Sequence, residues 1–535
     1  MMKQLFDPIQ VEVWRNLLSA IAEEMGATLE RTAYSPNIKE RLDHSCAVFD
    51  VQGRLLAQAA HIPVHLGAMP LMLKTLLPRV QWFPGVMWLC NDPRVGGTHL
   101  PDLTLVAPVY ITPTEDSSFS GKVLIGFVAS RAHHADIGGL SPGSLPLSTE
   151  LYHEGLILSP VRLVVRGRVQ EDIQDLVCAN SRTPQERRGD LSAQVAANET
   201  GMRRFRELVT QYGYVRFQQR AQETLIYAEE VLRRALSELP LGTHSATDYL
   251  DGDGVEETPI PIRVTVQHTK AGEVTFDFAG SAKQVRGSLN ATEAITRSAC
   301  YYVVRCLVEE EIPTNEGCFA PVHVIAPEGT IVNARFPAAV AAGNVETSQR
   351  IVDVLLQALA KFAPERIPAS SQGTMNNITI GGNSAEGRPF AYYETLAGGA
   401  GASPTTSGAS AIHSHMTNTR NTPVESLETH YPLRVLEYSI AEGTGGEGMY
   451  QGGEGILRRI QLLTEARISL LTERRTIPPP GLNGGGAGNT GRNSLLLPDK
   501  THLTLPSKWS ETCPKDSILT IQTPGGGGWG KRSVD

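Results

Sequence analysis

The chain has 535 residues, too many for one simple core, so we expect two to four packed subdomains. Its contents of 41% hydrophobic and 19% charged residues are those of a soluble globular protein. Its formal net charge of -8 and the lack of a long basic run argue against a nucleic-acid-binding protein. No apolar run reaches membrane-spanning length and the amino terminus lacks the apolar core of a signal peptide, so we expect a cytoplasmic protein without membrane contact.

The first 180 residues alternate between helical and strand patterns. Asp7 followed by Pro8 predicts a helix start, because aspartate caps a helix and proline is tolerated in its first turn. Apolar residues at helical spacing continue this helix to Leu29. We then expect a hairpin over 46–57, a helix over 69–77, and strands over 103–109 and 123–129 that flank a polar insert at 112–121.

The rest of the chain separates into three patterns. Residues 183–238 predict two long helices that are interrupted at Gly213, and residues 257–281 alternate like strands. Buried helices are expected over 291–309 and 345–362, and the remainder is β-rich with many glycines. We therefore predict a mixed α/β (α+β) fold with parts at 1–180, 181–240, 241–365 and 366–535. The β-rich part is expected to contact a partner.

A histidine and an aspartate are the strongest candidates for chemistry. His99 precedes Asp102 by three residues, directly after a glycine pair. Pro101 lies between them, which favours an extended loop leading into a strand over a helical turn. Asp43 upstream and His133 downstream offer ligands of the same kind. Such a set suits a divalent metal that keeps a position open for water, while the alternative is a hydrogen-bonded structural pair.

Two residues close to His133 are weaker candidates. Because side chains alternate along a strand, His134 should point away from the face that carries His133. Asp136 is a candidate for orienting a metal-binding histidine by a hydrogen bond to its other ring nitrogen.

Several other motifs do not support a function. Residues 139–143 match G-x-S-x-G, but Pro142 has no N–H for an oxyanion hole, so we predict a turn. No P-loop is present, and the glycine runs at 445–448 and 525–528 are interpreted as flexible turns. Residues 251–254 lack the spacing of a calcium loop. His413 and His415 are interpreted as polar groups for a substrate or an interface. The seven cysteines contain no C-x-x-C pair, which indicates reduced thiols.

Taken together, the motifs resemble the hydantoinase B/oxoprolinase family over nearly the whole chain, about residues 5–530. The matching stretches lie at 41–45, 62–67, 91–102, 131–139, 189–194, 343–348, 394–401 and 419–425. The insert at 112–121 is a departure, since it lengthens the gap between Asp102 and His133.

The resemblance implies the B subunit of an ATP-dependent enzyme that hydrolyses cyclic amides, such as 5-oxoproline or hydantoins. ATP would bind a hydantoinase A-like partner in a hetero-oligomer and phosphorylate the amide oxygen there. Water activated by one divalent metal (Mn, Zn or Fe) on this chain would then open the ring. The alternatives are an acetone carboxylase-type subunit and a non-catalytic assembly partner.

The resemblance also assigns residues. It makes His99, Asp102 and His133 both metal ligands and catalytic residues, with Asp43 as a fourth ligand. Membership of matching stretches suggests Arg41, Asn344 and Glu346 as substrate-binding residues, and structural ion pairing is an equally good account of each.

Overall fold

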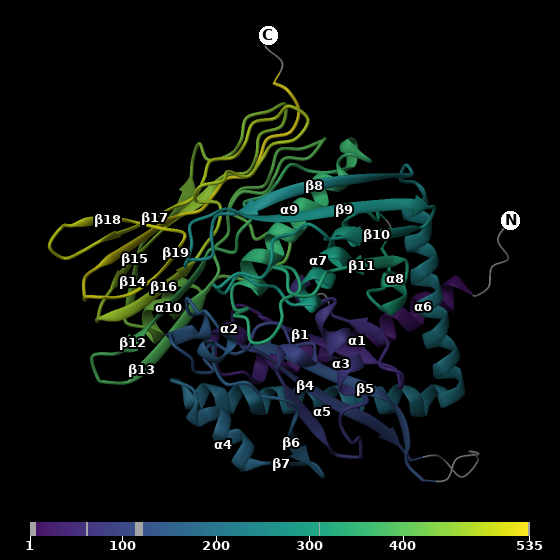
Figure 1. Ribbon diagram of the computed structural model, residues 1–535. Coiled ribbons are helices and arrows are strands. Elements are labelled where there is room, and N and C mark those ends of the chain that lie inside the picture. Colours follow the sequence, from purple (N-terminus) through teal and green to yellow (C-terminus); the bar gives the residue numbers. More distant parts are fainter. Residues whose placement is uncertain (1–6, 60–61, 113–120, 310, 533–535) are drawn as a thin grey trace.

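The computed structural model describes residues 7–59, 62–112, 121–309 and 311–532, which form a mixed α/β fold built on four sheets (Figure 1). Most of the insert expected at 112–121 lies outside the described residues. None of the described helices combines the length and the hydropathy that a membrane-spanning segment needs.

The first sheet carries the candidate ligands. It has seven strands in the order β2-β1-β5-β4-β3-β6-β7, and its neighbouring strands are antiparallel. The strands are β1 His44–Phe49, β2 Leu55–Gln58, β3 Met87–Cys90, β4 Asp102–Ile111, β5 Val123–His133, β6 Val161–Val165 and β7 Arg168–Val169. β1 is buried along its whole length because helices cover both faces of the sheet.

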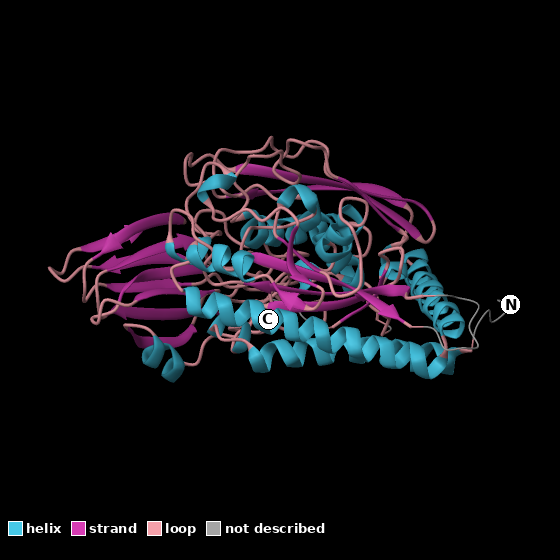
Figure 2. Ribbon diagram, turned by 90° about the horizontal axis from the view of Figure 1, so that it is seen from below, coloured by secondary structure: helices cyan, strands magenta, loops and turns pink. Residues whose placement is uncertain are grey.

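Long helices cover one face of this sheet. The Asp7 side chain caps α1 by accepting a hydrogen bond from the backbone of Ile9, as expected. Figure 2 shows the long helices that run across the strands, and α5 packs against both α1 and β4. Gly213, with φ 83°, separates α5 from α6 at the predicted position. The helices of this part are α1 Pro8–Thr32, α2 Pro36–Lys39, α3 Ala68–Leu76, α4 Glu171–Ala179, α5 Pro184–Tyr212 and α6 Tyr214–Ser237, with short 3-10 turns at Pro63–His65, Pro93–Val95, Pro142–Ser144 and Leu151–His153.

A second sheet lies beyond the opposite face of the first. Its order is β11-β10-β9-β8, with β10 and β11 parallel, and α7 and α9 lie between it and the first sheet (Figure 1). The elements are β8 Gly242–Leu250, β9 Ile260–Lys270, β10 Glu273–Asp277, β11 Val322–Ile325, α7 Glu293–Cys306, α8 Glu316–Phe319 and α9 Ser348–Leu359, with a π-helical turn at Gly343–Thr347 and a 3-10 turn at Pro364–Arg366. The predicted alternation in β9 is confirmed, because Ile262, Val264 and Val266 are all buried.

The C-terminal part is β-rich, as expected. It forms the antiparallel sheets β13-β12-β16-β19 and β14-β15-β20-β17-β18. The elements are β12 Asn377–Asn383, β13 Pro389–Glu394, α10 Val424–His430, β14 Leu433–Ala441, β15 Gly455–Leu462, β16 Ala466–Leu471, β17 Arg492–Leu496, β18 His502–Leu505, β19 Lys508–Cys513 and β20 Ile518–Gln522.

The glycine runs were wrongly interpreted as flexible turns. The Gly446 N–H donates to the Gly526 carbonyl at 2.8 Å, so the two runs lie side by side. The N–H groups of Gly526 and Gly528 donate in turn to the carbonyls of Gly453 and Gly486. A Cβ at Gly526 would collide with the carbonyl of Ala400. Glycine is therefore required here by the close approach of backbones.

Buried charges join the second sheet to the C-terminal part. The Arg474 guanidinium Nη2 lies 2.7 Å from carboxylate oxygens of both Asp248 and Asp353, and all three residues are buried. Removing one partner of such a group leaves uncompensated buried charge, so the cluster fixes the relative position of its segments. The boundaries at 180, 240 and 365 stay a prediction.

Candidate metal centre

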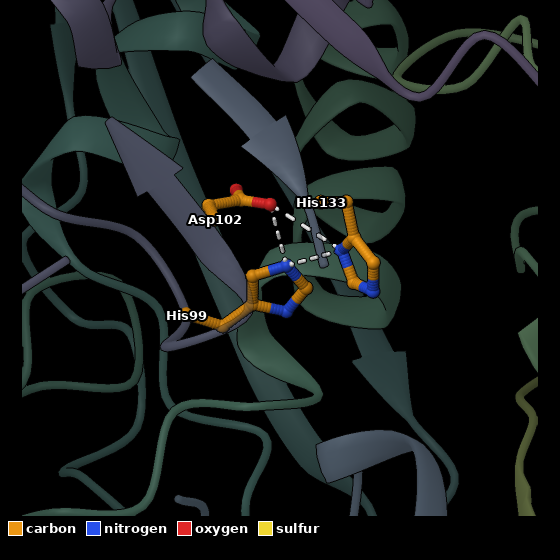
Figure 3. A group of neighbouring side chains, drawn as sticks. All are labelled: His99, Asp102 and His133. Carbon is orange, nitrogen blue, oxygen red and sulfur yellow. Dashed lines mark hydrogen bonds and ion pairs between the residues drawn. The ribbon is translucent and has the colours of Figure 1, made fainter. Parts of the chain in front are cut away.

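The candidate ligands come from two neighbouring strands. Asp102 begins β4 and His133 ends β5, and the antiparallel register sets these two residues directly opposite each other. His99 lies on the turn that leads into β4, where the Asp102 N–H donates to the His99 carbonyl at 3.2 Å. Opposed residues point to the same face of a sheet, so the register brings the three side chains together (Figure 3).

The glycine pair before His99 shapes this turn. Gly96 has φ 83°, a left-handed conformation that favours glycine, and a Cβ at Gly97 would collide with the carbonyl of Asn91. The expectation of a loop instead of a helical turn is confirmed.

Three atoms form an almost equilateral triangle. His99 Nε2 lies 3.0 Å from Asp102 Oδ1 and 3.1 Å from His133 Nδ1, and His133 Nδ1 lies 3.3 Å from Asp102 Oδ1. All three side chains are at most 3% exposed, so they face one another away from solvent. Ligands at bond lengths of about 2.0–2.2 Å from one cation are separated by roughly 3 to 3.5 Å. The triangle therefore has the size of a metal-ligand set.

Hydrogen bonding also fits a cation at the centre. His99 Nδ1 lies 3.2 Å from the Ala341 carbonyl, which only accepts, so Nδ1 carries the proton. In the neutral ring Nε2 then holds a lone pair, to which the Asn344 Nδ2 donates at 3.0 Å. This lone pair faces the Asp102 carboxylate, another acceptor. Two acceptors at this distance need a proton or a metal ion between them, and two imidazoles with one carboxylate suit Mn, Zn or Fe.

Neighbouring charges decide the protonation of the triangle. Burial lowers the pKa of His99, but the charge and hydrogen bond of Asp102 outweigh burial and raise the pKa. Burial opposes ionisation of Asp102, yet the charge of His99 and hydrogen bonds from three histidines hold its pKa well below 3.8. For His133 burial prevails, and the pKa is lowered. Without a metal ion, the shared proton therefore resides on His99, and a bound metal would displace it.

The second oxygen of Asp102 has its own partners. The Thr98 hydroxyl donates to Oδ2 at 2.6 Å, and His65 Nε2 lies 3.4 Å from the same atom. The other ring nitrogen of His65 lies 2.8 Å from the Ser45 hydroxyl. His65 lies within the matching stretch at 62–67, but its role depends on packing between segments far apart in the chain.

Glu154 supports His99 through the backbone. Its Oε1 accepts from the Ser148 hydroxyl at 2.6 Å and from the N–H groups of Val340 and Ala341 at 2.8 and 2.9 Å. The same Ala341 peptide segment supplies the carbonyl that accepts from His99. Burial raises the pKa of Glu154 to about 7, although these donors oppose the shift. No motif in the sequence marks this residue.

Asp43 is close to the triangle but not part of it. Its carboxylate lines the same cavity, and its backbone carbonyl accepts from the His133 N–H at 3.0 Å. Within the described chain, the group of possible ligands contains His99, Asp102 and His133 and omits Asp43. Its place as a fourth ligand stays a prediction.

The three predicted substrate-binding residues have different environments. Asn344 lines the cavity, and its Oδ1 has no hydrogen-bond partner. Arg41 is fully buried and does not line the cavity. Its guanidinium donates hydrogen bonds to neighbouring oxygen atoms instead. Glu346 also lies outside the lining. Its Oε1 accepts from the Met375 N–H and from the Asn377 amide, and burial raises its pKa to about 8.

The residues next to His133 have other roles. His134 faces away and its Nε2 lies 2.9 Å from Gln194 Oε1, so the expected alternation is observed. The expectation that Asp136 orients a histidine is wrong. Its carboxylate accepts from the backbone of Gly138 and Gly143 and from Arg182, and it thereby shapes the turn at Pro142–Ser144.

The remaining motifs make contacts within the chain, and the interpretation of His413 and His415 as polar groups for a substrate or an interface stays a prediction. The turn predicted at 139–143 is present. The Asp251 carboxylate accepts from the backbone of Arg475 and Ile477, as a loop-closing residue. His413 and His415 contact different partners, Asn421 and Tyr302.

The triangle lines a small cavity of about 20 Å³, which has room for an ion or a water molecule. It has to widen before a lactam ring can bind. Its lining comes from segments at both ends of the chain: Asp43, Ile62, Val64, His65, His99, Asp102, His133, Asn344, Val345, Met375, Tyr393, Thr395, Met416, Thr417 and Thr419.

Comparison with known proteins matches residues 7–532 to the family model described as hydantoinase B/oxoprolinase. The chain is 40% identical over 536 residues to a 5-oxoprolinase of Dictyostelium discoideum, covering 98% of this chain and 40% of that protein. It is 30% identical to a protein of a Pseudomonas species named as the B subunit of a D-/L-hydantoinase, covering 98% of this chain and 90% of that protein. The chain thus spans about two fifths of the length of the 5-oxoprolinase.

Two solved structures share this fold. The crystal structure of an ATP-dependent caprolactamase from Pseudomonas jessenii has a TM-score of 0.90 at 26% identity, covering 99% of this chain and 93% of that one. A nucleotide-free structure of acetone carboxylase has a TM-score of 0.88 at 18% identity, covering 98% of this chain and 76% of that one. The second likeness concerns the fold alone.

Proposed function

This chain belongs to the hydantoinase B/oxoprolinase family, and on that basis we propose that it is the metal-bearing B subunit of an ATP-dependent enzyme that opens a cyclic amide. The names of its relatives support this substrate class, since 5-oxoproline, hydantoins and caprolactam all contain a ring amide. The name of the hydantoinase B subunit supports a multi-subunit enzyme, in which an A-type partner would bind ATP.

The observation that carries the proposal is the buried triangle of His99, Asp102 and His133 at a small cavity. Two lone pairs and a carboxylate that converge from two strands and a turn are costly to bury without a cation. These residues would hold one divalent metal, with Asp43 as the fourth ligand. When bound, the metal would act as a Lewis acid and would lower the pKa of a water molecule.

The other residues would bind and orient the ring. Amide resonance makes a lactam carbonyl a poor electrophile, so phosphorylation of its oxygen on the partner would prepare it for attack by water here. Asn344 would orient the ring, because its unpartnered Oδ1 can accept a hydrogen bond from the ring N–H. Opening would yield glutamate from 5-oxoproline, or an N-carbamoyl amino acid from a hydantoin.

Glu346 has a positioning role in this proposal. It accepts from the Asn377 amide, whose Oδ1 accepts from the Tyr393 hydroxyl at 3.0 Å. The Tyr393 ring stacks on His133 with centroids 4.8 Å apart. Glu346 would thus hold the aromatic surface against which His133 keeps its orientation.

The first test is metal content by mass spectrometry for the wild-type chain, His99→Ala and His502→Ala. His502 is an exposed histidine on β18 and serves as the matched control. We expect about one metal ion per chain in the wild type and the control, and its loss in His99→Ala. A wild-type chain that stays metal-free after reconstitution at neutral pH would refute the metal centre.

The second test is turnover with the A-type partner. ATP-dependent opening of 5-oxoproline or a hydantoin is the expected result. Consumption of a ketone that requires bicarbonate would replace the proposal with a carboxylase role. Full activity of a complex that contains His99→Ala would indicate a non-catalytic assembly partner.

A further inference from the structure

Arg41 is a buried cation without a carboxylate partner in the described chain. Its guanidinium donates to Asn37 Oδ1, to the carbonyls of Tyr393 and Arg420, and to Thr395 Oγ1. All of these acceptors are neutral. A buried charge is costly unless an opposite charge compensates it, so this position favours a nearby anion.

A row of hydroxyl groups leads from Arg41 to the cavity. Arg41 Nη2 donates to Thr395 Oγ1 at 2.9 Å, Thr395 Oγ1 lies 2.9 Å from Thr419 Oγ1, and Thr419 Oγ1 lies 3.3 Å from Thr417 Oγ1. All three threonines line the cavity and are buried. We call them the threonine row.

One hydroxyl proton of the threonine row is not used in hydrogen bonds within the row. Three hydroxyl groups carry three protons, and only two hydrogen bonds join the hydroxyls to one another. Because Arg41 donates to Thr395, the row is polarised away from the guanidinium. Thr417, at the far end, therefore keeps the proton that can point into the cavity.

The cavity is therefore lined by two kinds of polar group. Acceptors come from the triangle, from Asp43 and from Asn344 Oδ1. The threonine row adds hydroxyl groups that are hydrogen-bonded to the positively charged Arg41. No lysine or arginine side chain lines the cavity within the described chain. The threonine hydroxyl groups therefore connect the cavity to the positive charge of Arg41.

We propose that the threonine row, polarised by the Arg41 guanidinium, binds an anionic oxygen of the substrate. The inference rests on the proposed function and deepens it. Such an oxygen belongs either to a carboxylate on the ring, as in 5-oxoproline, or to the phosphoryl group added to the amide. Both are strong acceptors for the spare hydroxyl proton, and both supply the negative charge that Arg41 lacks. The row would hold the ring in the same cavity as the metal ligands.

Binding to the full, manganese-loaded chain tests the proposal by isothermal titration calorimetry. The probes are 5-oxoproline, 2-pyrrolidone, which is the same ring without the carboxylate, and inorganic phosphate. If the row binds a ring carboxylate, wild type should bind 5-oxoproline about tenfold or more tightly than 2-pyrrolidone. Thr419→Val, which breaks the row at its centre, should reduce this preference to near parity, and Thr419→Ser should keep it.

A matched control uses Thr422, another buried threonine of the same segment that does not line the cavity and whose hydroxyl has no partner. Thr422→Val should leave all affinities unchanged. Melting temperature and metal content of Thr419→Val should equal those of wild type, which separates loss of the row from loss of the fold.

The outcomes distinguish the two sources of the anion. Loss of phosphate affinity in Thr419→Val, with the preference for 5-oxoproline intact, would support the proposal and assign the row to the phosphoryl group. Unchanged affinity for both anions would overturn it. If the complex opens no cyclic amide while Thr419→Val still abolishes anion binding, the proposed function fails and the anion site stands.

Discussion

Replacing Glu154 by glutamine tests how burial sets the pKa of the Glu154 carboxyl group, which supports His99 through the Ala341 segment. The Glu154 side chain is 0% exposed, and one of its oxygens accepts three hydrogen bonds while the other has no partner. Glutamine keeps a carbonyl oxygen for the three donors and cannot ionise. Any cost of its unpartnered amide group is independent of pH, so the variant isolates the titration of the carboxyl group.

The expected magnitude follows from the raised pKa of Glu154, about 7 against an ordinary 4.5. The folded chain binds this proton more tightly than the unfolded chain. The stabilising contribution is therefore complete below pH 4.5 and is lost as pH rises through 7. At 1.36 kcal/mol per pKa unit, the loss amounts to about 3 kcal/mol by pH 8. Glu346, with a pKa of about 8, titrates in both proteins and cancels from the comparison.

The assay compares melting temperatures of metal-free wild type and Glu154→Gln from pH 4.5 to pH 8. An unfolding entropy of about 2.1 cal/mol/K per residue predicts that the variant gains about 3 °C relative to wild type across this range. A chelator in both samples removes any contribution from metal release. Two curves that stay parallel would refute the argument that the folded chain holds the Glu154 proton more tightly.

Three further predictions concern the ligand set and the buried charges. His133→Ala should lose the metal measured by mass spectrometry, and His134→Ala should retain it, since the two rings lie on opposite faces; the reverse pattern would contradict the assignment. Thr98→Val should weaken metal affinity by about 10- to 100-fold in a chelator competition, because Asp102 loses a hydrogen bond of 2.6 Å; equal affinities would contradict this. Arg474→Met should destabilise the fold by about 3–5 kcal/mol in thermal unfolding, because two buried aspartates lose one of their two arginine partners and keep only Arg350; a shift below about 1 kcal/mol would argue against the cluster.

Local patterns predicted many of the elements. Asp7 and Pro8 determine where α1 begins, Gly213 separates two long helices, and strand alternation sets His133 and His134 on opposite faces. These features depend on backbone geometry and on neighbours within a few residues, which a sequence displays directly. β8 was missed, because its polar side chains carry little periodic signal and its pairing with β9 stabilises it.

What the sequence determined by itself is the chemistry available: His99 and Asp102 on a glycine turn, His133 at a strand end, and Asp43 and Asn344 within motifs. Only the tertiary structure decided which groups meet. Arg41 reaches Thr395 across 354 positions of sequence, and Asn344 reaches His99 across 245. Glu154 lies outside every matching stretch, and the stretches that contain His65, Thr395 and Thr419 do not reveal their roles, because their partners are set by how distant segments pack. Burial then raises the pKa of Glu154, since it removes the water that would otherwise stabilise the charged carboxylate.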